Sequence, residues 1–217
     1  MSIIKGLKNI EAILDKPKSD MSSGQKVTWL KLDDGQSASI RFLSELDADS
    51  PNYDEKRGLA IVVSEHTNPE DYKRKAVCSA ESQGRCFGCE MYRKEPKSGW
   101  RPRLRFYCNV VFDNGIDDKH VAVWSMGVSK TATFNTLREY VADAGSISNM
   151  VWKLKRNGKG TETNYVLLPT KTDTEPFNWS GFEPFNLEKV VKDVPYSEQE
   201  SFYFGFSNAA TSTSVDW

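Results

Sequence analysis

Three of the chain's four cysteines and one of its two histidines lie close together in the sequence. They follow the order His66, Cys78, Cys86 and Cys89, so the last two form a Cys-x2-Cys pair. We expect no export signal, and in a protein that is not exported, clustered cysteines are more often metal ligands than a disulfide framework. Three thiolates and one imidazole fill the tetrahedral coordination of zinc and leave no position for water. The spacing therefore predicts one structural Zn²⁺ ion, held by these four side chains.

A second interpretation makes Cys86 and Cys89 a redox pair and His66 an ordinary surface histidine. Redox pairs of this spacing belong to a thioredoxin-like βαβ pattern, and the residues around this pair do not follow it. We therefore favour zinc. Gly88, inside the pair, is expected to let the backbone turn so that both sulfur atoms face one point.

The remaining cysteine and histidine show no comparable arrangement. Cys108 alternates with apolar residues on both sides, which predicts a small buried hydrophobe. His120 lies close to two aspartates without a nucleophile or second ligand nearby in the sequence, and we expect a solvated turn residue. A zinc-dependent nuclease would need an open coordination position and a nearby base. Because the four predicted ligands leave no position open, we expect a binding protein and not an enzyme.

The formal net charge of the chain is −1, but the charges are unevenly distributed. Residues 66–105 carry 10 Lys+Arg against 5 Asp+Glu, and residues 171–217 carry 3 against 8. Residues 101–110 alternate in character, as in a strand whose neighbouring side chains point to opposite faces. A row of cations with a tyrosine on one solvent-facing side indicates a polyanionic partner. One face is predicted to join the core with Leu104, Phe106, Cys108 and Val110, and the other to carry Arg101, Arg103, Arg105, Tyr107 and Asn109.

Basic side chains interleaved with aromatic rings are typical of proteins that bind single-stranded nucleic acid. Lys and Arg neutralise phosphates, and rings stack on unpaired bases. The alternative is a solvated edge strand that its charges protect against aggregation. A second, smaller basic patch at Lys153 and Lys155 is explained equally well by a solvated hairpin. The candidate nucleic-acid-binding residues are Tyr72, Lys73, Arg74, Lys75, Arg85, Phe87, Tyr92, Arg93, Trp100, Arg101, Arg103, Arg105, Tyr107, Lys153 and Lys155.

The elements that must position these residues are mostly strands. Residues 3–16 have apolar residues at helical spacing, and residues 17–26 have the composition of a linker. A helix is predicted over residues 129–144, ended by Gly145. A few short strands with one helix are typical of a small Greek-key barrel such as the OB-fold, with a sandwich or a ribbon-like fold as alternatives. Residues 27–32 and 39–43 are predicted to form a hairpin, and further strands are predicted over residues 59–64, 101–112, 119–126, 150–155 and 164–168.

The predicted fold class is therefore mainly β with some α, an OB-fold-like Greek-key barrel with an inserted zinc-binding subdomain. We expect an N-terminal helix and linker (residues 1–26), a core (27–170) with the insertion at about 66–100, and a C-terminal segment (171–217). That segment is acidic and contains many aromatic residues, so we expect it to pack on the body or dock on a partner. It would compete for the basic cleft until nucleic acid binds. A short helix is predicted near Ser197.

The order of these features resembles a known family. The strand over residues 38–43, a histidine after an apolar strand, then Cys78 and the Cys86-x2-Cys89 pair are similar to the zinc-containing single-stranded DNA-binding (helix-destabilising) proteins of T-even and related bacteriophages, including phages of actinobacteria. The resemblance covers residues 27–170. It implies an OB-fold core, a zinc-bearing subdomain beside the DNA cleft with Arg41 nearby, and sequence-tolerant binding. It also implies a role in phage DNA replication, recombination and repair.

This chain departs from that family at both ends. The family's N-terminal segment is strongly basic, whereas here Lys5 and Lys8 are offset by Glu11 and Asp15. The family's long Asp/Ser-rich tail is replaced by a shorter segment that contains many aromatic residues. Cooperative binding along DNA and recruitment of partners by the tail therefore do not follow from the resemblance.

Together these observations predict a protein that coats single-stranded DNA. Replication or recombination proteins are the expected partners of the acidic segment, and the cytoplasm of the bacterial host is the expected location. Neither a membrane nor a small-molecule substrate is expected. The alternative is a zinc-ribbon interaction protein of a phage transcription or replication complex that binds RNA or a protein partner.

Overall fold

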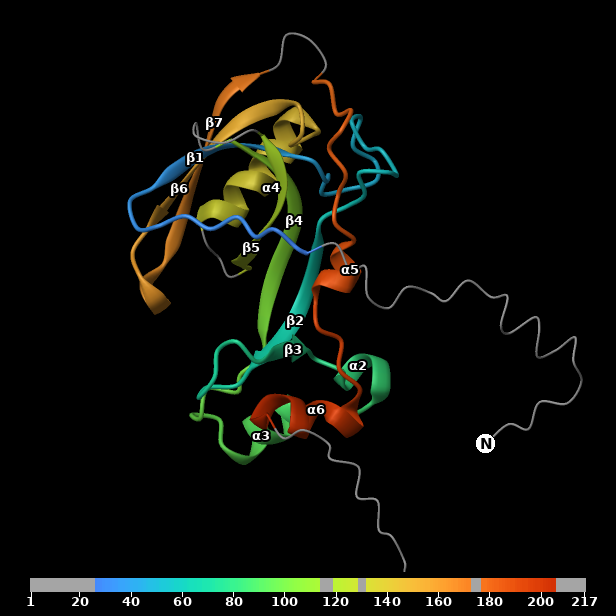
Figure 1. Ribbon diagram of the computed structural model, residues 1–217, viewed down its shortest axis with the longest axis vertical. Coiled ribbons are helices and arrows are strands. Elements are labelled where there is room, and N and C mark those ends of the chain that lie inside the picture. Colours follow the sequence, from blue (N-terminus) through green and yellow to red (C-terminus); the bar gives the residue numbers. More distant parts are fainter. Residues whose placement is uncertain (1–25, 114–118, 129–131, 173–176, 206–217) are drawn as a thin grey trace, which may run out of the picture.

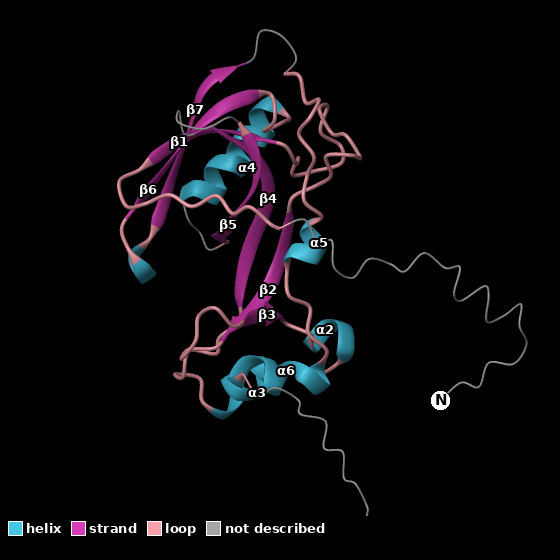
Figure 2. Ribbon diagram, viewed as in Figure 1, coloured by secondary structure: helices cyan, strands magenta, loops and turns pink. Residues whose placement is uncertain are grey.

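The computed structural model describes residues 26–113, 119–128, 132–172 and 177–205. These residues form two lobes (Figure 1). The larger, which we call the sheet lobe, holds most of the β-sheet and helix α4 (Ala132–Ala144). The smaller, which we call the small lobe, contains the short helices α2 (Ala80–Gln83), α3 (Phe87–Lys94) and α6 (Tyr196–Phe204). Figure 2 shows that the small lobe is built mainly from helices and loops.

The described residues form a seven-stranded antiparallel sheet in the order β3-β2-β4-β1-β6-β7, with β5 paired to β4. Strand β4 is the longest, with 11 residues, and it connects the two lobes. Its first half pairs with β2, its second half with β1, and most of its length with β5. The strands are β1 (Ser37–Phe42), β2 (Ile61–Thr67), β3 (Lys75–Val77), β4 (Arg103–Asp113), β5 (His120–Gly127), β6 (Met150–Asn157) and β7 (Asn164–Thr172).

The main core lies between the sheet and helix α4. Aromatic side chains fill it, with Phe42 in edge-on contact with Trp152 and Phe106 in edge-on contact with Trp124. Leu137 of α4 is fully buried against them. Gly145, with φ of 74°, ends the helix in the left-handed conformation that favours glycine. The helix predicted over residues 129–144 is thus confirmed for its described part.

The predicted hairpin of residues 27–32 with 39–43 is wrong. Strand β1 pairs with β4 and β6, and residues 27–32 instead run beside β5. The Leu30 N–H donates to the Val123 carbonyl at 2.9 Å, and the Val123 N–H donates to the Thr28 carbonyl at 2.8 Å. Alternation identifies an extended segment, but it does not identify the neighbour with which that segment pairs. The predicted N-terminal helix, residues 3–16, lies outside the described residues.

The mainly β class is confirmed, with short helices as expected. Across the described residues the sheet stays open, because β5 and β7 are not paired with each other. Strands β2 and β3 and helices α2 and α3 are inserted in the sequence between the paired strands β1 and β4. No helix of the described residues has the length and apolar character needed to cross a membrane.

The C-terminal segment runs from the sheet lobe to the small lobe and does not extend away from the protein (Figure 1). Its helix α5 (Leu187–Val190) contacts β4, and its helix α6 contacts α3. The short helix predicted near Ser197 is confirmed as α6, which begins one residue earlier, after Pro195. Residues 177–205 therefore form part of the folded body.

Candidate metal centre and the basic surface around it

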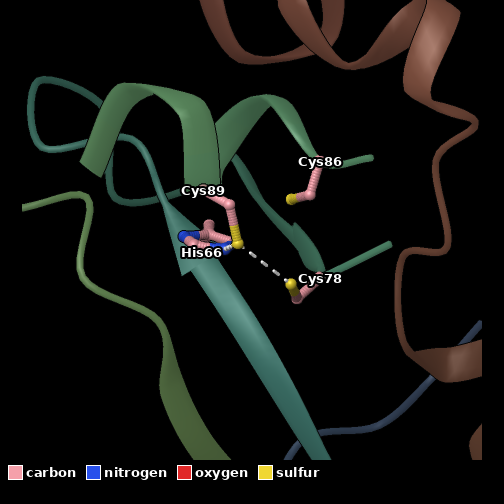
Figure 3. A group of neighbouring side chains, drawn as sticks. All are labelled: His66, Cys78, Cys86 and Cys89. Carbon is pink, nitrogen blue, oxygen red and sulfur yellow. Dashed lines mark hydrogen bonds between the residues drawn. The ribbon is translucent and has the colours of Figure 1, made fainter. Parts of the chain in front are cut away.

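The four predicted ligands come from three neighbouring elements of the small lobe (Figure 3). His66 lies in β2, and Cys78 follows directly after β3. Cys86 is the N-cap residue of α3, and Cys89 lies in the first turn of that helix. Their four ligand atoms all lie within 4.8 Å of one another. The antiparallel pairing of β2 with β3 and the start of α3 bring together residues that are 23 positions apart in the sequence.

Two of the distances between the ligand atoms lie within about 0.4 Å of those around a tetrahedral ion. The His66 Nε2 atom lies 3.2 Å from Cys89 Sγ, and Cys78 Sγ lies 3.4 Å from Cys89 Sγ. Bond lengths of about 2.3 Å to sulfur and about 2.0 Å to nitrogen around a tetrahedral zinc would separate these atoms by roughly 3.5–3.8 Å. The donor set is also the one zinc prefers in structural sites. The residues present therefore fit the predicted ion.

A hydrogen bond at Nδ1 of His66 determines that Nε2 is the ring nitrogen that faces the cysteines. Its Nδ1 atom lies 2.7 Å from the carbonyl oxygen of Trp100, to which an Nδ1–H donates. Nε2, the nitrogen directed at Cys89, is then the ring nitrogen available to bind a metal. The ring is completely buried, so this orientation is held by its surroundings.

Gly88 is required for a different reason from the one predicted. It lies inside α3, and its backbone is not in the left-handed region. A Cβ atom at this position would lie 2.3 Å from Cγ of His66. Glycine is therefore needed because the imidazole packs directly on the helix backbone.

The three sulfur atoms differ in their electrostatic environment. Burial raises the pKa of Cys86, but hydrogen bonds from His66 and from the backbone of Cys89 and Ser79 outweigh it and lower the pKa to about 6. Burial and the neighbouring thiols raise the pKa of Cys89 to about 12. Burial also raises the pKa of Cys78. Three adjacent thiolates repel one another, and a bound cation would relieve that repulsion.

A Cys-x2-Cys pair at a helix N-terminus is also the arrangement of a redox pair. Here, however, an imidazole nitrogen and a third sulfur lie within 4.8 Å of the pair. A dithiol that reacts with an external disulfide needs neither of these two groups. The cluster therefore favours metal binding over redox exchange.

Comparison with known proteins adds no relative. No family model, curated protein or solved structure matches this chain. The case for a metal centre therefore depends on the geometry of the four side chains and on the groups that hold them. The resemblance to phage proteins stays an expectation.

Three of the predicted nucleic-acid-binding residues instead surround a buried carboxylate, Glu65, which is 3% exposed. The Tyr107 hydroxyl donates to Glu65 Oε1 at 2.5 Å. Lys75 Nζ and Arg105 Nε lie 3.9 and 3.8 Å from Glu65 Oε2. Burial lowers the pKa of Lys75, and burial together with the Glu65 hydrogen bond raises the pKa of Tyr107. These side chains compensate an internal charge. Tyr107 is buried, so its prediction as a stacking ring is wrong, whereas Lys75 and Arg105 are about a third exposed and their assignment to a nucleic-acid surface stays a prediction.

Both faces of β4 are buried over much of its length. The predicted core face is confirmed for Phe106, Cys108 and Val110, whereas Leu104 is 51% exposed. The opposite face, with Tyr107 and Asn109, was predicted to face solvent and is also buried. A second cluster covers it, formed by segments distant in the sequence that contribute Val27, Trp29, Val123, Phe185 and Leu187.

Two predicted stacking rings are packed inside the small lobe. Trp100 is 4% exposed and meets Tyr203 edge-on, with ring centroids 4.9 Å apart. Phe87 stacks on the Tyr203 ring with centroids 6.1 Å apart and planes inclined by 25°, and it meets Trp100 edge-on at 5.9 Å. These rings form the small lobe's own core. Trp100 is buried, so the prediction that it stacks on bases is wrong, whereas the prediction for the partly buried Phe87 stays untested.

Three predicted cations contact the C-terminal segment. The Arg41 guanidinium lies 4.4 Å from the centre of the Phe177 ring. Arg74 Nη1 donates to the Phe202 carbonyl at 2.5 Å, near the end of α6. Arg85 stacks on the Tyr196 ring at 4.1 Å and donates to its hydroxyl at 2.5 Å. The C-terminal segment therefore makes direct contacts with three basic residues, and its competition with a polyanion stays a prediction.

The other predicted cations are exposed, and several gather at the end of the small lobe. Two loops meet there, residues 68–74 and 95–102, and a Cβ at Gly99 would lie 3.1 Å from Cγ of Pro69. We call the exposed part of these loops, with the adjoining first residue of β4, the basic tip. None of its cations forms an ion pair within the described part of the chain. The basic tip carries Tyr72, Lys73, Lys97, Arg101 and Arg103.

The remaining predicted residues lie at two separate places. Tyr92 and Arg93 line a cavity of about 320 Å³ beside the cysteines, together with Arg85. Lys153 and Lys155 are exposed on β6 and pair in register with Leu168 and Val166 of β7. The structure does not bring these two places together with the basic tip into one continuous groove.

His120 was predicted to be a solvated turn residue, and this is corrected. It is half-buried in β5, and its ring meets Phe112 edge-on with centroids 5.2 Å apart. The predicted strand over residues 119–126 already contained His120, so strand pairing was the signal that the turn interpretation overlooked.

Proposed function

We propose that this protein binds single-stranded nucleic acid, DNA in the first place, at the basic tip and without catalysis. The observation that carries the proposal is the exposure of Lys73, Arg101 and Arg103 beside Tyr72, whose side chain is 75% exposed. The loop of residues 95–102 lies next to the Cys₃His cluster, since the Trp100 carbonyl accepts a hydrogen bond from His66. Cations and a ring on a braced surface are what a flexible polyanion with unpaired bases requires.

The physical reasons for single strands are charge and stacking. Each phosphate neutralised by a Lys or Arg releases a counterion, which makes binding strongly salt-dependent. An exposed tyrosine stacks on any base, worth about 1–3 kcal/mol per base. In a duplex the bases are already stacked on one another, so the ring would gain nothing there. Sequence-tolerant binding follows because neither contact reads the edge of a base.

The strand order supports an OB-like core. Along the chain, β1, β4, β5, α4, β6 and β7 follow the strand-strand-strand-helix-strand-strand order of that fold. The two strands that remain unpaired approach each other, because the Trp124 and Tyr165 ring centroids lie 5.8 Å apart. OB-folds bind oligonucleotides at strands 2 and 3 and at the loop between strands 1 and 2. In this chain that connection holds β2, β3, α2, α3 and the two loops of the basic tip.

The metal would be structural and would be held by His66, Cys78, Cys86 and Cys89. A bound Zn²⁺ contributes folding free energy locally. The chain's own residues keep the basic tip in place. The protein would coat single-stranded DNA during phage DNA replication, recombination and repair. RNA or protein binding within a larger complex is the alternative.

Anisotropy of a labelled oligothymidylate, measured with increasing salt, tests the proposal. Replacing both Arg101 and Arg103 by Ala is expected to weaken binding and to reduce the salt slope by about 0.7 for each phosphate that is no longer neutralised. Arg138→Ala is the matched control, because Arg138 is exposed on α4 in the sheet lobe. Equal affinity of the double variant and wild type would contradict the proposal. Tighter binding of RNA of matched sequence would favour the alternative.

A further inference from the structure

Helix α6 of the C-terminal segment is packed against α3, the helix that carries Cys89 (Figure 1). Two of its residues, Gln199 and Tyr203, are completely buried. A buried glutamine is costly unless its amide groups are hydrogen-bonded. The partners of Gln199 therefore show what this helix does in the small lobe.

The side-chain amide of Gln199 joins the two loops that carry the cysteines. The Phe87 N–H donates to Gln199 Oε1 at 2.8 Å. Gln199 Nε2 donates to Ser79 Oγ at 2.8 Å and to the Val194 carbonyl at 2.9 Å. Ser79 follows Cys78, and Phe87 follows Cys86. One side chain thus fixes the spacing of two sulfur ligands that come from different loops.

The hydroxyl of Ser79 extends this connection. Ser79 Oγ donates to the Arg85 carbonyl at 2.6 Å, directly before Cys86. Gln199, Ser79 and the backbone on both sides of Cys86 therefore form one hydrogen-bonded unit. The unit contains no exposed member that water could easily replace, since Gln199 and Ser79 are both completely buried.

The other end of α6 supports the histidine. Tyr203 packs edge-on against Trp100, whose carbonyl accepts the hydrogen bond from His66. The Tyr203 carbonyl in turn accepts a hydrogen bond from Asn68 Nδ2 at 2.9 Å, two residues beyond His66. Helix α6 thus contacts the surroundings of three of the four predicted ligands.

We infer that α6 is an integral part of the metal centre, with Gln199 as the positioning residue that sets the separation of Cys78 and Cys86. This inference rests on the metal site of the proposed function. If α6 favours the arrangement that binds the ion, then the ion favours docking of α6 by the same factor, because binding couplings are reciprocal. Metal binding then holds the C-terminal segment on the small lobe.

Competition with a chromophoric chelator, on the full-length protein, measures the effect on zinc affinity. Gln199→Leu removes all three hydrogen bonds at similar volume and is expected to weaken Zn²⁺ binding about 10–100-fold, as for other groups that orient metal ligands. Gln199→Glu retains the acceptor for Phe87 and should lie between Gln199→Leu and wild type. Glu200→Gln, on an exposed position of the same helix, is the matched control and should bind zinc as wild type does.

Thermal unfolding with and without zinc separates positioning from packing. A positioning role reduces the rise in Tm that zinc produces, because that rise reports the affinity of the folded state. A purely structural role lowers both Tm values equally and leaves zinc affinity unchanged, which would overturn the inference. Failure of the wild-type protein to bind zinc would instead refute the metal site itself.

If Gln199→Leu does not fold, hydrogen exchange on the wild-type protein gives the answer. Chelation is expected to speed amide exchange in residues 196–204 as well as in residues 87–94. Unchanged protection of residues 196–204 after loss of the metal would overturn the inference, because coupling must act in both directions.

Discussion

Replacing Gly88 by Ala tests the packing of the metal centre directly. In most helices this substitution stabilises by about 1 kcal/mol, because alanine has the higher helix propensity. Gly88 has ordinary helical geometry, so nothing in its backbone opposes the change. The opposition comes from His66, whose Cγ would lie 2.3 Å from the new Cβ, with its own Cβ and Cδ2 atoms at 2.7 Å.

The expected magnitude follows from these distances. An ordinary contact for a Cβ begins at 3.4 Å, so the ring and the helix must separate by about 1 Å. Metal–ligand distances tolerate only about 0.2 Å, so His66 cannot keep its place among the sulfur ligands. Overpacking of this kind costs about 1–3 kcal/mol, which exceeds the gain in helix propensity. If half of this cost, about 0.5–1.5 kcal/mol, is carried by the metal-bound state, we expect zinc affinity to fall about 2- to 13-fold.

Chelator competition on the Gly88→Ala protein measures this loss. Gly127→Ala is the control, because a Cβ at that exposed glycine meets no atom within 4 Å. Its zinc affinity should equal that of wild type. A Gly88→Ala protein with wild-type affinity, or with raised stability in the presence of zinc, would refute the assignment of His66 as a ligand.

Three further predictions concern the thiols, the buried charge and the C-terminal segment. Near neutral pH the raised pKa values of Cys78 and Cys89 keep them protonated, whereas Cys86, with a pKa of about 6, is ionised. Zinc binding should therefore release about two protons and weaken as pH falls. Calorimetry in buffers of different ionisation enthalpy measures the number of protons released, and a number near zero would contradict the prediction. Arg105→Ala removes one of the two cations beside Glu65 and should cost about 1–3 kcal/mol of stability in urea unfolding; an unchanged midpoint would show that Lys75 alone compensates the carboxylate. Asn109→Ala removes two hydrogen bonds to the Phe185 backbone, of 2.9 and 3.0 Å. It should lower the free energy of unfolding by about 1–3 kcal/mol and speed proteolysis of residues 177–205. Equal cleavage rates in variant and wild type would argue against a role of Asn109 in holding this segment.

The metal ligands could be predicted from the sequence because their chemistry is local. The cysteine spacing and one upstream histidine leave very few possible sets of four ligands, and choosing among these sets needs no knowledge of strand pairing. Gly88 was identified for the wrong reason, since the approach of His66 to the helix backbone depends on how β2 packs against α3. Gln199 carries no sequence signal at all, because a glutamine in an acidic segment shows nothing of the loops it joins.

The basic face was predicted only in part, since Arg101 and Arg103 are exposed whereas Tyr107 is buried, because alternation describes only one strand at a time. A strand in the middle of a sheet can be covered on both faces, and the cover over Tyr107 comes from residues near both ends of the described chain. Glu65 was overlooked because it stands in an apolar strand beside a metal ligand. Once Glu65 is buried, nearby cations are drawn inward, so the positive charge of residues 66–105 exceeds what the surface displays.

The continuity of β4 determines how the small lobe and the sheet lobe are coupled mechanically. Its residues 103–107 pair with β2 in the direction of the small lobe, and residues 110–113 pair with β1 in the sheet lobe, without a break between them. Eleven residues of strand extend about 36 Å. The cysteine-bearing half therefore cannot swivel as a free finger on a linker. A force applied to the small lobe would be transmitted along β4 to its hydrogen bonds with β1. A fragment containing only the cysteine-bearing part would lack the half of β4 that pairs with the sheet lobe.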